Sequence, residues 1–330
     1  MSEENQDLSF ESRIDLSGLH QAVSAIRHEI GKVVIGQPQM IDLLLTALFA
    51  DGHVLIEGVP GVAKTLTAKL LAKTISIDFS RIQFTPDLMP SDVLGTAIFN
   101  PKKADFEYRK GPIFSNIVLI DEINRSPAKT QAALFEVMEE RQITTDGQTY
   151  PMAEPFIVLA TQNPIEQEGT YRLPEAQLDR FLFKISVKYP SLEEEISILE
   201  SHHQQKSIAE MITQVKAVLS GNQILELRNK VRNVLVESKI LAYIAQIIHQ
   251  TRNNKFLYLG ASPRASVALL NASKALAAIR GRDFVTPEDV QELAPSVLGH
   301  RLLLTPEKEM EGATTQDIVT QIIQKVEVPR

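Results

Sequence analysis

The residue types that could do chemistry are most concentrated in one glycine-rich loop, which reads Gly-Val-Pro-Gly-Val-Ala-Lys-Thr from Gly58 to Thr65. The mostly apolar His53–Glu57 before it predicts a buried strand, and Leu66–Lys73 after it predicts a helix. That strand–loop–helix order is what a phosphate-binding loop requires. Backbone N–H groups and the helix N-terminus would hold phosphate oxygens. Lys64 would reach the β- and γ-phosphates, and the Thr65 hydroxyl would bind Mg²⁺.

One position departs from the strict loop pattern. The residue before Lys64 is Ala63 where the pattern has glycine, and alanine adopts a positive φ angle only with strain. Considered alone, the stretch could therefore be an ordinary glycine-rich turn. Interpreted as a nucleotide loop, it predicts contacts with the nucleotide from Gly58, Val59, Pro60, Gly61, Val62, Ala63, Lys64, Thr65 and Leu66.

An acidic pair supplies the second half of the expected chemistry. Ile117–Ile120 is a continuous apolar run, as expected of a strand buried on both faces of a parallel sheet. Asp121 and Glu122 follow it directly, at the edge where such sheets bind ligands. Asp121 would hold Mg²⁺, directly or through water, and Glu122 would act as general base on the attacking water. An isolated Asp-Glu pair usually just begins a loop, but one that follows a phosphate loop and a buried strand indicates catalysis.

A polar amide ends a third apolar run. Phe156–Thr161 is rich in strand-forming residues and is followed by Gln162, Asn163 and Pro164. An amide at that strand tip would position a water between Glu122 and the γ-phosphate. By itself, Asn-Pro more often begins a turn, so this interpretation depends on the two preceding segments.

Composition limits the class of protein. The length of 330 residues favours about two domains. Hydrophobic residues make up 44% and charged residues 23% of the chain, which is ordinary for a soluble globular protein. No apolar run is long enough to span a bilayer, and the polar, acidic N-terminus lacks the pattern of a secretory signal. The absence of cysteine excludes disulfides and fits a cytoplasmic protein. The net charge of −7 gives no overall basic footprint for nucleic acid.

Strands and helices alternate through the first part of the chain, which favours a parallel sheet covered by helices on both faces. Two helices are expected first, over Leu16–Lys32 and Pro38–Ala50. Two hairpin insertions are expected later, one within Leu94–Pro112 and one around the Asp146-Gly147 turn. The expected strands are His53–Glu57, Arg81–Phe84, Ile117–Ile120, Phe156–Thr161 and Phe183–Val187.

The composition changes at Tyr189-Pro190, and no convincing strand follows. The sequence therefore predicts an α/β domain with its N-terminal helices over residues 1–188 and an all-helical domain over residues 189–330. The adjacent His202 and His203 would point about 100° apart on a helix, so metal binding by that pair is not expected. The expected helices are Leu192–His203, Asn222–Arg232, Ser238–Thr251, Pro263–Ile279 and Pro287–Ala294.

In this order along residues 16–305, the motifs resemble those of the MoxR-family AAA+ ATPases. The resemblance implies a P-loop AAA+ core with hairpin insertions, followed by a helical lid, and it implies ATP and Mg²⁺ as ligands. The alanine before the loop lysine is common in that family, whereas Arg172 departs from its usual pattern and is given no role. The segments that carry the resemblance are Gly58–Thr65, Phe84–Leu88, Gly111–Phe114, Asp121–Arg125, Ala160–Pro164, Leu173–Phe181 and Gly260–Arg264.

The resemblance also implies roles that the residues alone do not indicate. Asn163 matches the first sensor of the family. Arg180 looks like the arginine finger, which would reach the γ-phosphate of a neighbouring subunit; a surface arginine that pairs with Asp179 or Glu175 is the alternative. Arg264 resembles the second sensor, carried by the lid of the same subunit, and the alternative is a helix-start arginine with a local acidic partner.

One further segment, Val34-Ile35-Gly36, looks like the wall on the adenine side of the nucleotide. A plain core segment is an equally good interpretation of these residues. Arg125 could also act between subunits and is left unassigned.

Three functions compete at this point. The first is an ATP-driven chaperone or remodeller that forms a ring, expected to be a hexamer, and acts on proteins with von Willebrand factor A domains. The second is a nucleic-acid motor, which the acidic net charge disfavours. The third is a nucleotide-gated switch with little turnover, which the complete set of catalytic residue types disfavours. The first is preferred.

Overall fold

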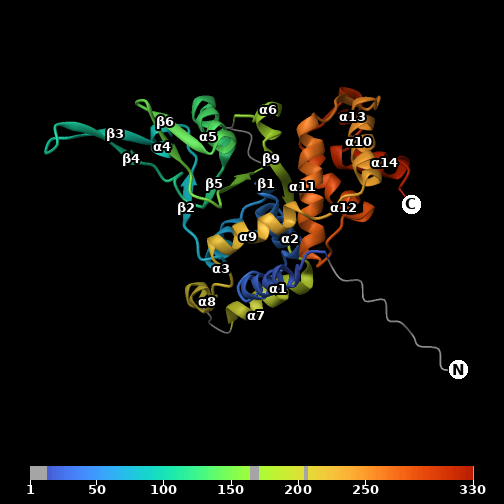
Figure 1. The fold of residues 1–330 in the computed structure, drawn as a ribbon, viewed down its shortest axis with the longest axis horizontal. Coiled ribbons are helices and arrows are strands. Elements are labelled where there is room, and N and C mark those ends of the chain that lie inside the picture. The colour runs from blue at the N-terminus through green and yellow to red at the C-terminus, as the bar shows by residue number, and fades with distance from the viewer. Residues whose placement is uncertain (1–12, 164–170, 204–206, 330) are drawn as a thin grey trace.

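The computed structural model describes residues 13–163, 171–203 and 207–329. Among these residues, five strands pair in parallel to form the central sheet, in the order β2–β5–β8–β1–β9 (Figure 1). The strands are β1 (His53–Gly58), β2 (Phe79–Gln83), β5 (Ile117–Asp121), β8 (Ile157–Gln162) and β9 (Phe181–Val187). The five strands expected from the sequence are confirmed, with ends that differ by at most two residues.

Side chains of the sheet alternate between two hydrophobic cores because successive strand residues point to opposite faces. In β1, Val54 and Ile56 belong to one core and Leu55 to the other. Ile117 and Val118 of β5 divide in the same way. This burial on both faces is the reason that the strands appear in the sequence as unbroken apolar runs.

Helices cover both faces, as predicted. The larger core includes α1 (Ser17–Gly31), α2 (Pro38–Ala50) and α3 (Lys64–Thr74), together with most of the C-terminal helices. The smaller core includes α4 (Pro90–Leu94) and α5 (Ala128–Glu140). The 3-10 helix η1 (Ile123–Arg125) connects β5 to α5, and α6 (Glu175–Leu178) precedes β9.

Both hairpin insertions are confirmed. Strands β3 (Gly95–Asn100) and β4 (Asp105–Lys110) form an antiparallel pair that extends away from the sheet, and β6 (Gln142–Thr145) pairs with β7 (Gln148–Pro151) (Figure 1). Asp146 and Gly147, at φ 49° and 75°, form the turn between β6 and β7. Positive φ at both central residues suits the right-handed twist of paired strands.

The C-terminal part is helical, and each predicted helix there is present. Its helices are α7 (Leu192–His203), α8 (Ile208–Gln214), α9 (Gly221–Arg232), α10 (Ser238–Arg252), α11 (Pro263–Ile279), α12 (Pro287–Leu298), α13 (Pro306–Met310) and α14 (Thr315–Lys325). The expectation that no strand follows residue 189 is wrong in one detail. The short strands β10 (Leu257–Leu259) and β11 (Leu303–Leu304) pair antiparallel, and each is too brief to show periodicity in the sequence.

The two parts of the chain share one core. Leu44 of α2, Leu269 of α11 and Val319 of α14 belong to the same buried cluster. Helices α7 and α8 are separate from α10 to α14 (Figure 1). Glu194 of α7 packs against Gly36, and the backbone N–H of Lys216 donates to Glu29 of α1 at 2.9 Å. A boundary between residues 188 and 189 therefore stays a prediction. Among the described residues, no helix combines the length and the apolar character needed to cross a bilayer.

Candidate active site

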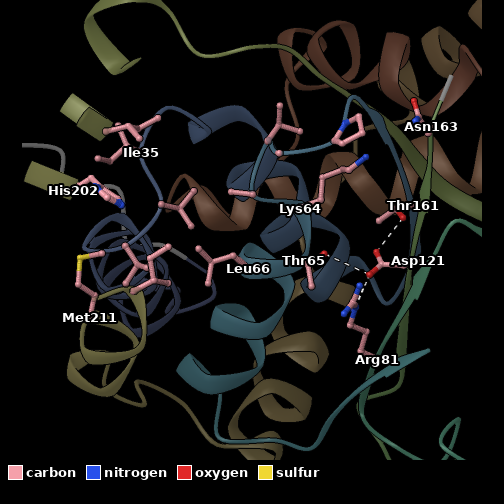
Figure 2. A pocket seen from close by; sticks show the side chains of 18 of the residues that line it. Ile35, Lys64, Thr65, Leu66, Arg81, Asp121, Thr161, Asn163, His202 and Met211 are labelled. Carbon is pink, nitrogen blue, oxygen red and sulfur yellow. Dashed lines mark hydrogen bonds and ion pairs between the residues drawn. The ribbon is translucent and has the colours of Figure 1, made fainter. Parts of the chain in front are cut away.

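The residues predicted to bind phosphate and Mg²⁺ and to activate water meet in one cleft at the carboxyl ends of β1, β5 and β8. The carboxyl ends of parallel strands lie at the same edge of the sheet, so segments that are distant in sequence become neighbours there. The cavity has a volume of about 580 Å³. Figure 2 shows Lys64, Thr65, Asp121 and Asn163 around it. The lining residues include Val33–Ile35, Pro60–Leu66, Arg81, Gln83, Asp121, Glu122, Thr161 and Asn163.

The phosphate loop has the conformation that its chemistry needs. Gly61 adopts φ 89° and Ala63 adopts φ 60°, so the departure from the glycine pattern places an alanine in the left-handed region. Helix α3 begins at Lys64, and its first N–H groups face the cleft as an anion site. Gly58 and Val59 are absent from the lining, because Gly58 packs against Val187 of β9 and Val59 packs against the larger hydrophobic core.

Lys64 lies half-buried in this loop and donates to the carbonyl oxygen of Gly58. Burial lowers the pKa of its ammonium group, and the carboxylates of Asp121, Glu122 and Glu57 act in the opposite direction. An ammonium group that is held by one carbonyl, in a cavity with phosphate-binding N–H groups, is available to a phosphate oxygen.

Asp121 is the centre of a buried polar cluster (Figure 2). Its Oδ2 lies 3.5 Å from the Thr65 hydroxyl, and its Oδ1 accepts from the Thr161 hydroxyl at 3.1 Å. The guanidinium of Arg81 forms an ion pair with Oδ2 at 2.5 Å. Sequence reasoning missed Arg81 and Thr161, since an arginine inside a strand and a threonine near a strand end carry no distinctive pattern.

Glu122 has a left-handed backbone, with φ 58° and ψ 52°. Its N–H donates to the Thr161 hydroxyl at 3.0 Å, and its carboxylate accepts from the Gln83 amide at 2.8 Å. Arg125 pairs with the same carboxylate at 3.1 Å. A non-glycine residue that is held in this region by surrounding bonds is typical of a functional position.

Asn163 follows β8 and is buried, with 8% of its surface exposed. It lines the cleft together with Glu122 and Lys64. Figure 2 shows it on the side of the cleft formed by β8. The structure therefore brings the amide to the side of the cleft where the sequence predicted it.

The side of the cleft away from the catalytic residues is apolar and is formed largely by α7 and α8. Val34 and Ile35 line it as predicted, together with Ile198, Ser201, Ile208 and Met211. Gly36 does not line it, because this glycine adopts φ 77° against the side chain of Glu194. His202 does line it (Figure 2). From the sequence, this histidine was considered only as a metal ligand, and the wall formed by α7 and α8 was not predicted.

Arg180 and Arg264 do not line this cleft. They line a second cavity of about 470 Å³ together with Glu139. Arg264 donates to Glu139 Oε1 at 2.8 Å, and Arg180 Nε lies 3.9 Å from Glu139 Oε2. Within the described residues, Arg180 pairs with neither of the carboxylates considered from the sequence. Asp179 instead binds Arg301 at 2.7 Å, and Glu175 lies 3.7 Å from Arg172.

The two cavities lie at opposite ends of β1. Gly52, which precedes the strand, lines the second cavity, whereas Pro60, which follows it, lines the first. Strand β1 has 6 residues, which corresponds to about 20 Å at ~3.3 Å per residue. An arginine side chain does not cover that distance. The expectation that Arg264 reaches the nucleotide of its own subunit is therefore wrong in this structure.

The chain has a phosphate loop after β1, an acidic pair after β5 and an amide after β8, and a helical part follows. This combination defines a P-loop ATPase of the AAA class. Residues 53–183 match the family described as "ATPase family associated with various cellular activities (AAA)". Residues 249–322 match the "AAA lid domain".

Whole-chain comparisons narrow this class. The protein named Chaperone MoxR1 of Mycobacterium tuberculosis is 43% identical over 92% of this chain and 81% of its own. The uncharacterized protein YeaC of Bacillus subtilis is 49% identical over 94% of this chain and 96% of its own. A crystal structure from Cytophaga hutchinsonii, described as that of a candidate ATPase, has a TM-score of 0.88 at 44% identity and covers 96% of this chain and 97% of its own. The chain belongs to the MoxR family of AAA+ ATPases.

Proposed function

We propose that the protein hydrolyses Mg-ATP as a ring-shaped chaperone that remodels protein partners. The observation that carries this proposal is the convergence of Lys64, Thr65, Asp121, Glu122 and Asn163 on one cleft. These side chains come from the ends of three parallel strands, and each has a separate task in phosphoryl transfer to water.

The tasks follow from the chemistry of each group. Lys64 and the N–H groups at the start of α3 bind the β- and γ-phosphates and offset their charge. The carboxylate of Glu122 accepts a proton from the attacking water, and the Asn163 amide orients that water by hydrogen bonding. Gln83 and Arg125 both contact the Glu122 carboxylate and hold it in one orientation.

The Thr65 hydroxyl and the Asp121 carboxylate fit a magnesium site. They are oxygen donors 3.5 Å apart, and hard cations such as Mg²⁺ take oxygen ligands, with water and phosphate completing the shell. When bound, Mg²⁺ would neutralise charge on the phosphates. In this chain, Thr161 holds the second oxygen of Asp121 and so orients the carboxylate.

The surface that carries Arg180 and Arg264, called the arginine face below, supports a site that is shared between subunits. Arg180 and Arg264 lie at the end of β1 opposite to the phosphate loop, so both serve a neighbouring nucleotide better than their own. A cation supplied in this way accelerates phosphoryl transfer by about 10³- to 10⁵-fold. A closed ring, expected to be a hexamer, provides such a neighbour for each subunit.

Protein partners are favoured over nucleic acid. The relative from Mycobacterium tuberculosis is named a chaperone, and the β3–β4 hairpin exposes Ile98, Phe99 and Phe106 to solvent. The net charge of −7 disfavours a DNA motor. Partners that contain von Willebrand factor A domains are proposed from the family resemblance.

Two substitutions test the catalytic assignment. Lys64→Ala removes a phosphate-binding charge, so ATP binding should be lost. Glu122→Gln keeps the shape of the site but removes the base, so binding should persist while turnover falls by about 10²- to 10⁴-fold. Nucleotide titration and steady-state phosphate release measure these effects. Lys69→Ala, an exposed lysine on the same helix, is the matched control. Normal turnover by Glu122→Gln would refute the base assignment.

Mixing variants tests the shared site. Arg180→Ala and Glu122→Gln should each be nearly inactive alone. Mixed rings contain interfaces with an intact Glu122 facing an intact Arg180, so activity should partly return. Absence of rescue at every ratio, with mixed assembly confirmed by native mass spectrometry, would contradict action between subunits. Rings of Glu122→Gln with ATP are also the reagent for capturing partners from native lysate.

A further inference from the structure

Two arginines that are distant in sequence converge on a single carboxylate. Arg180 directly precedes β9, and Arg264 lies in the first turn of α11. Glu139 lies near the end of α5, and its two oxygens face different partners. Oε1 accepts from Arg264 at 2.8 Å, and Oε2 lies 3.9 Å from Arg180 Nε.

The other carboxylates that line this cavity form ion pairs with different arginines. Asp51 pairs with Arg228 at 2.6 Å and with Arg141 at 3.0 Å. Asp179 pairs with Arg301 at 2.7 Å and also accepts from the Ser262 hydroxyl at 2.9 Å. Among the acidic residues that line this cavity, Glu139 is therefore the group that contacts both Arg180 and Arg264.

The guanidinium of Arg180 retains hydrogen-bonding capacity. It donates to the Phe135 carbonyl of α5. Its Nε is buried and makes no hydrogen bond within the described part of the chain, because Glu139 Oε2 at 3.9 Å is too distant for one. A buried N–H without an acceptor is unfavourable by roughly 1–3 kcal/mol, so this N–H would be stabilised by donating a hydrogen bond to a further oxygen atom.

We infer that Glu139 is a positioning residue that holds Arg180 and Arg264 side by side for the γ-phosphate of the neighbouring subunit. The inference rests on the proposed function, in which both arginines act across the interface. Two guanidinium groups repel each other, and a carboxylate between them offsets that repulsion while fixing their spacing. A phosphate group has enough oxygens to bind both arginines at once.

Loss of this carboxylate should weaken turnover without weakening nucleotide binding. The side chain of Arg264 is 57% exposed, so without Glu139 it would sample many rotamers. Displacement of a catalytic group by about 1 Å lowers rates by roughly 10²-fold, so we expect Glu139→Gln to reduce kcat by about 10- to 100-fold. The dissociation constant for ATP should stay unchanged, because the cleft that binds it lies at the other end of β1.

A complementation experiment tests the inference in assembled rings. Glu139→Gln should be rescued by Glu122→Gln subunits, because these provide an intact arginine face to the intact cleft of the Glu139→Gln subunit. It should not be rescued by Arg180→Ala subunits, because both variants are then defective on the same face. Glu140→Gln, the exposed neighbour on α5, should behave as wild type. Glu139→Asp keeps the charge on a shorter side chain and should be intermediate.

Each outcome decides a different point. Wild-type turnover by Glu139→Gln, or its rescue by Arg180→Ala subunits, would overturn the role of Glu139. Failure of rescue by Glu122→Gln subunits would also overturn it, provided that the Arg180→Ala and Glu122→Gln pair is itself rescued. If that reference pair also fails, the arrangement between subunits is wrong, and the inference about Glu139 is wrong with it.

Discussion

His53 should make the protein acid-sensitive, because its structure requires a neutral ring. It begins β1 with only 5% of its surface exposed. Its Nδ1 accepts the N–H of Val158 in β8 at 2.9 Å, and its Nε2 lies 3.1 Å from the Met138 carbonyl of α5. Protonation would turn the acceptor nitrogen into a donor that faces another donor. Burial, together with the nearby Arg141 guanidinium, lowers the pKa of His53 from 6.5 to about 4.

The size of the effect follows from this shift in pKa. Between pH 6.5 and about 4, the unfolded chain binds a proton at His53 that the folded chain does not. The free energy of unfolding therefore falls as the pH falls through this window. The full shift corresponds to about 3 kcal/mol, of which about 2 kcal/mol is lost between pH 7 and pH 5.

Urea unfolding at pH 7 and pH 5 measures this loss in the wild type and in His53→Gln. The variant should be less stable at pH 7 by about 1–3 kcal/mol, because it leaves the Val158 N–H without its acceptor. It should nevertheless lose about 2 kcal/mol less on acidification than the wild type. Buried His300 contributes equally to both proteins and cancels. His203→Gln, at an exposed histidine, is the control. An equal loss for the wild type and His53→Gln would refute the reasoning.

Three further substitutions have expected outcomes. Ala63→Gly should raise the free energy of unfolding by about 0.5–1 kcal/mol, because glycine adopts φ 60° without strain; an unchanged or lower urea midpoint would count against it. Arg81→Ala removes the ion pair with Asp121 and should lower the Mg²⁺ concentration needed for nucleotide binding by up to about fivefold, since such a partly exposed pair contributes about 0–1 kcal/mol; a higher requirement in a Mg²⁺ titration would contradict this. Asp289→Asn should destabilise the protein by about 3 kcal/mol, because it leaves Arg282 without the fully buried carboxylate that it pairs with at 2.5 Å; thermal unfolding unchanged from the wild type would exclude this role.

Local sequence patterns were sufficient to predict the helices and strands that position the predicted site residues. Helices α2 and α11 have the bounds that the sequence predicted, because proline at the first helical position marks where each begins. The strands were predictable because burial on both faces requires continuous apolar runs. The convergence of Lys64, Asp121 and Asn163 was predictable because parallel strands end at a common edge.

The tertiary structure decided which surface each remaining residue serves. The sequence places Arg264 at the start of a helix, but the packing of α11 against α2 determines that it faces Glu139 and lies far from the phosphate loop. In the same way, the packing of α7 against Gly36 brings His202 into the nucleotide cleft. Such placements depend on contacts between residues far apart in the chain. Periodicity and capping describe only neighbours along it, so those contacts were not open to prediction from the sequence.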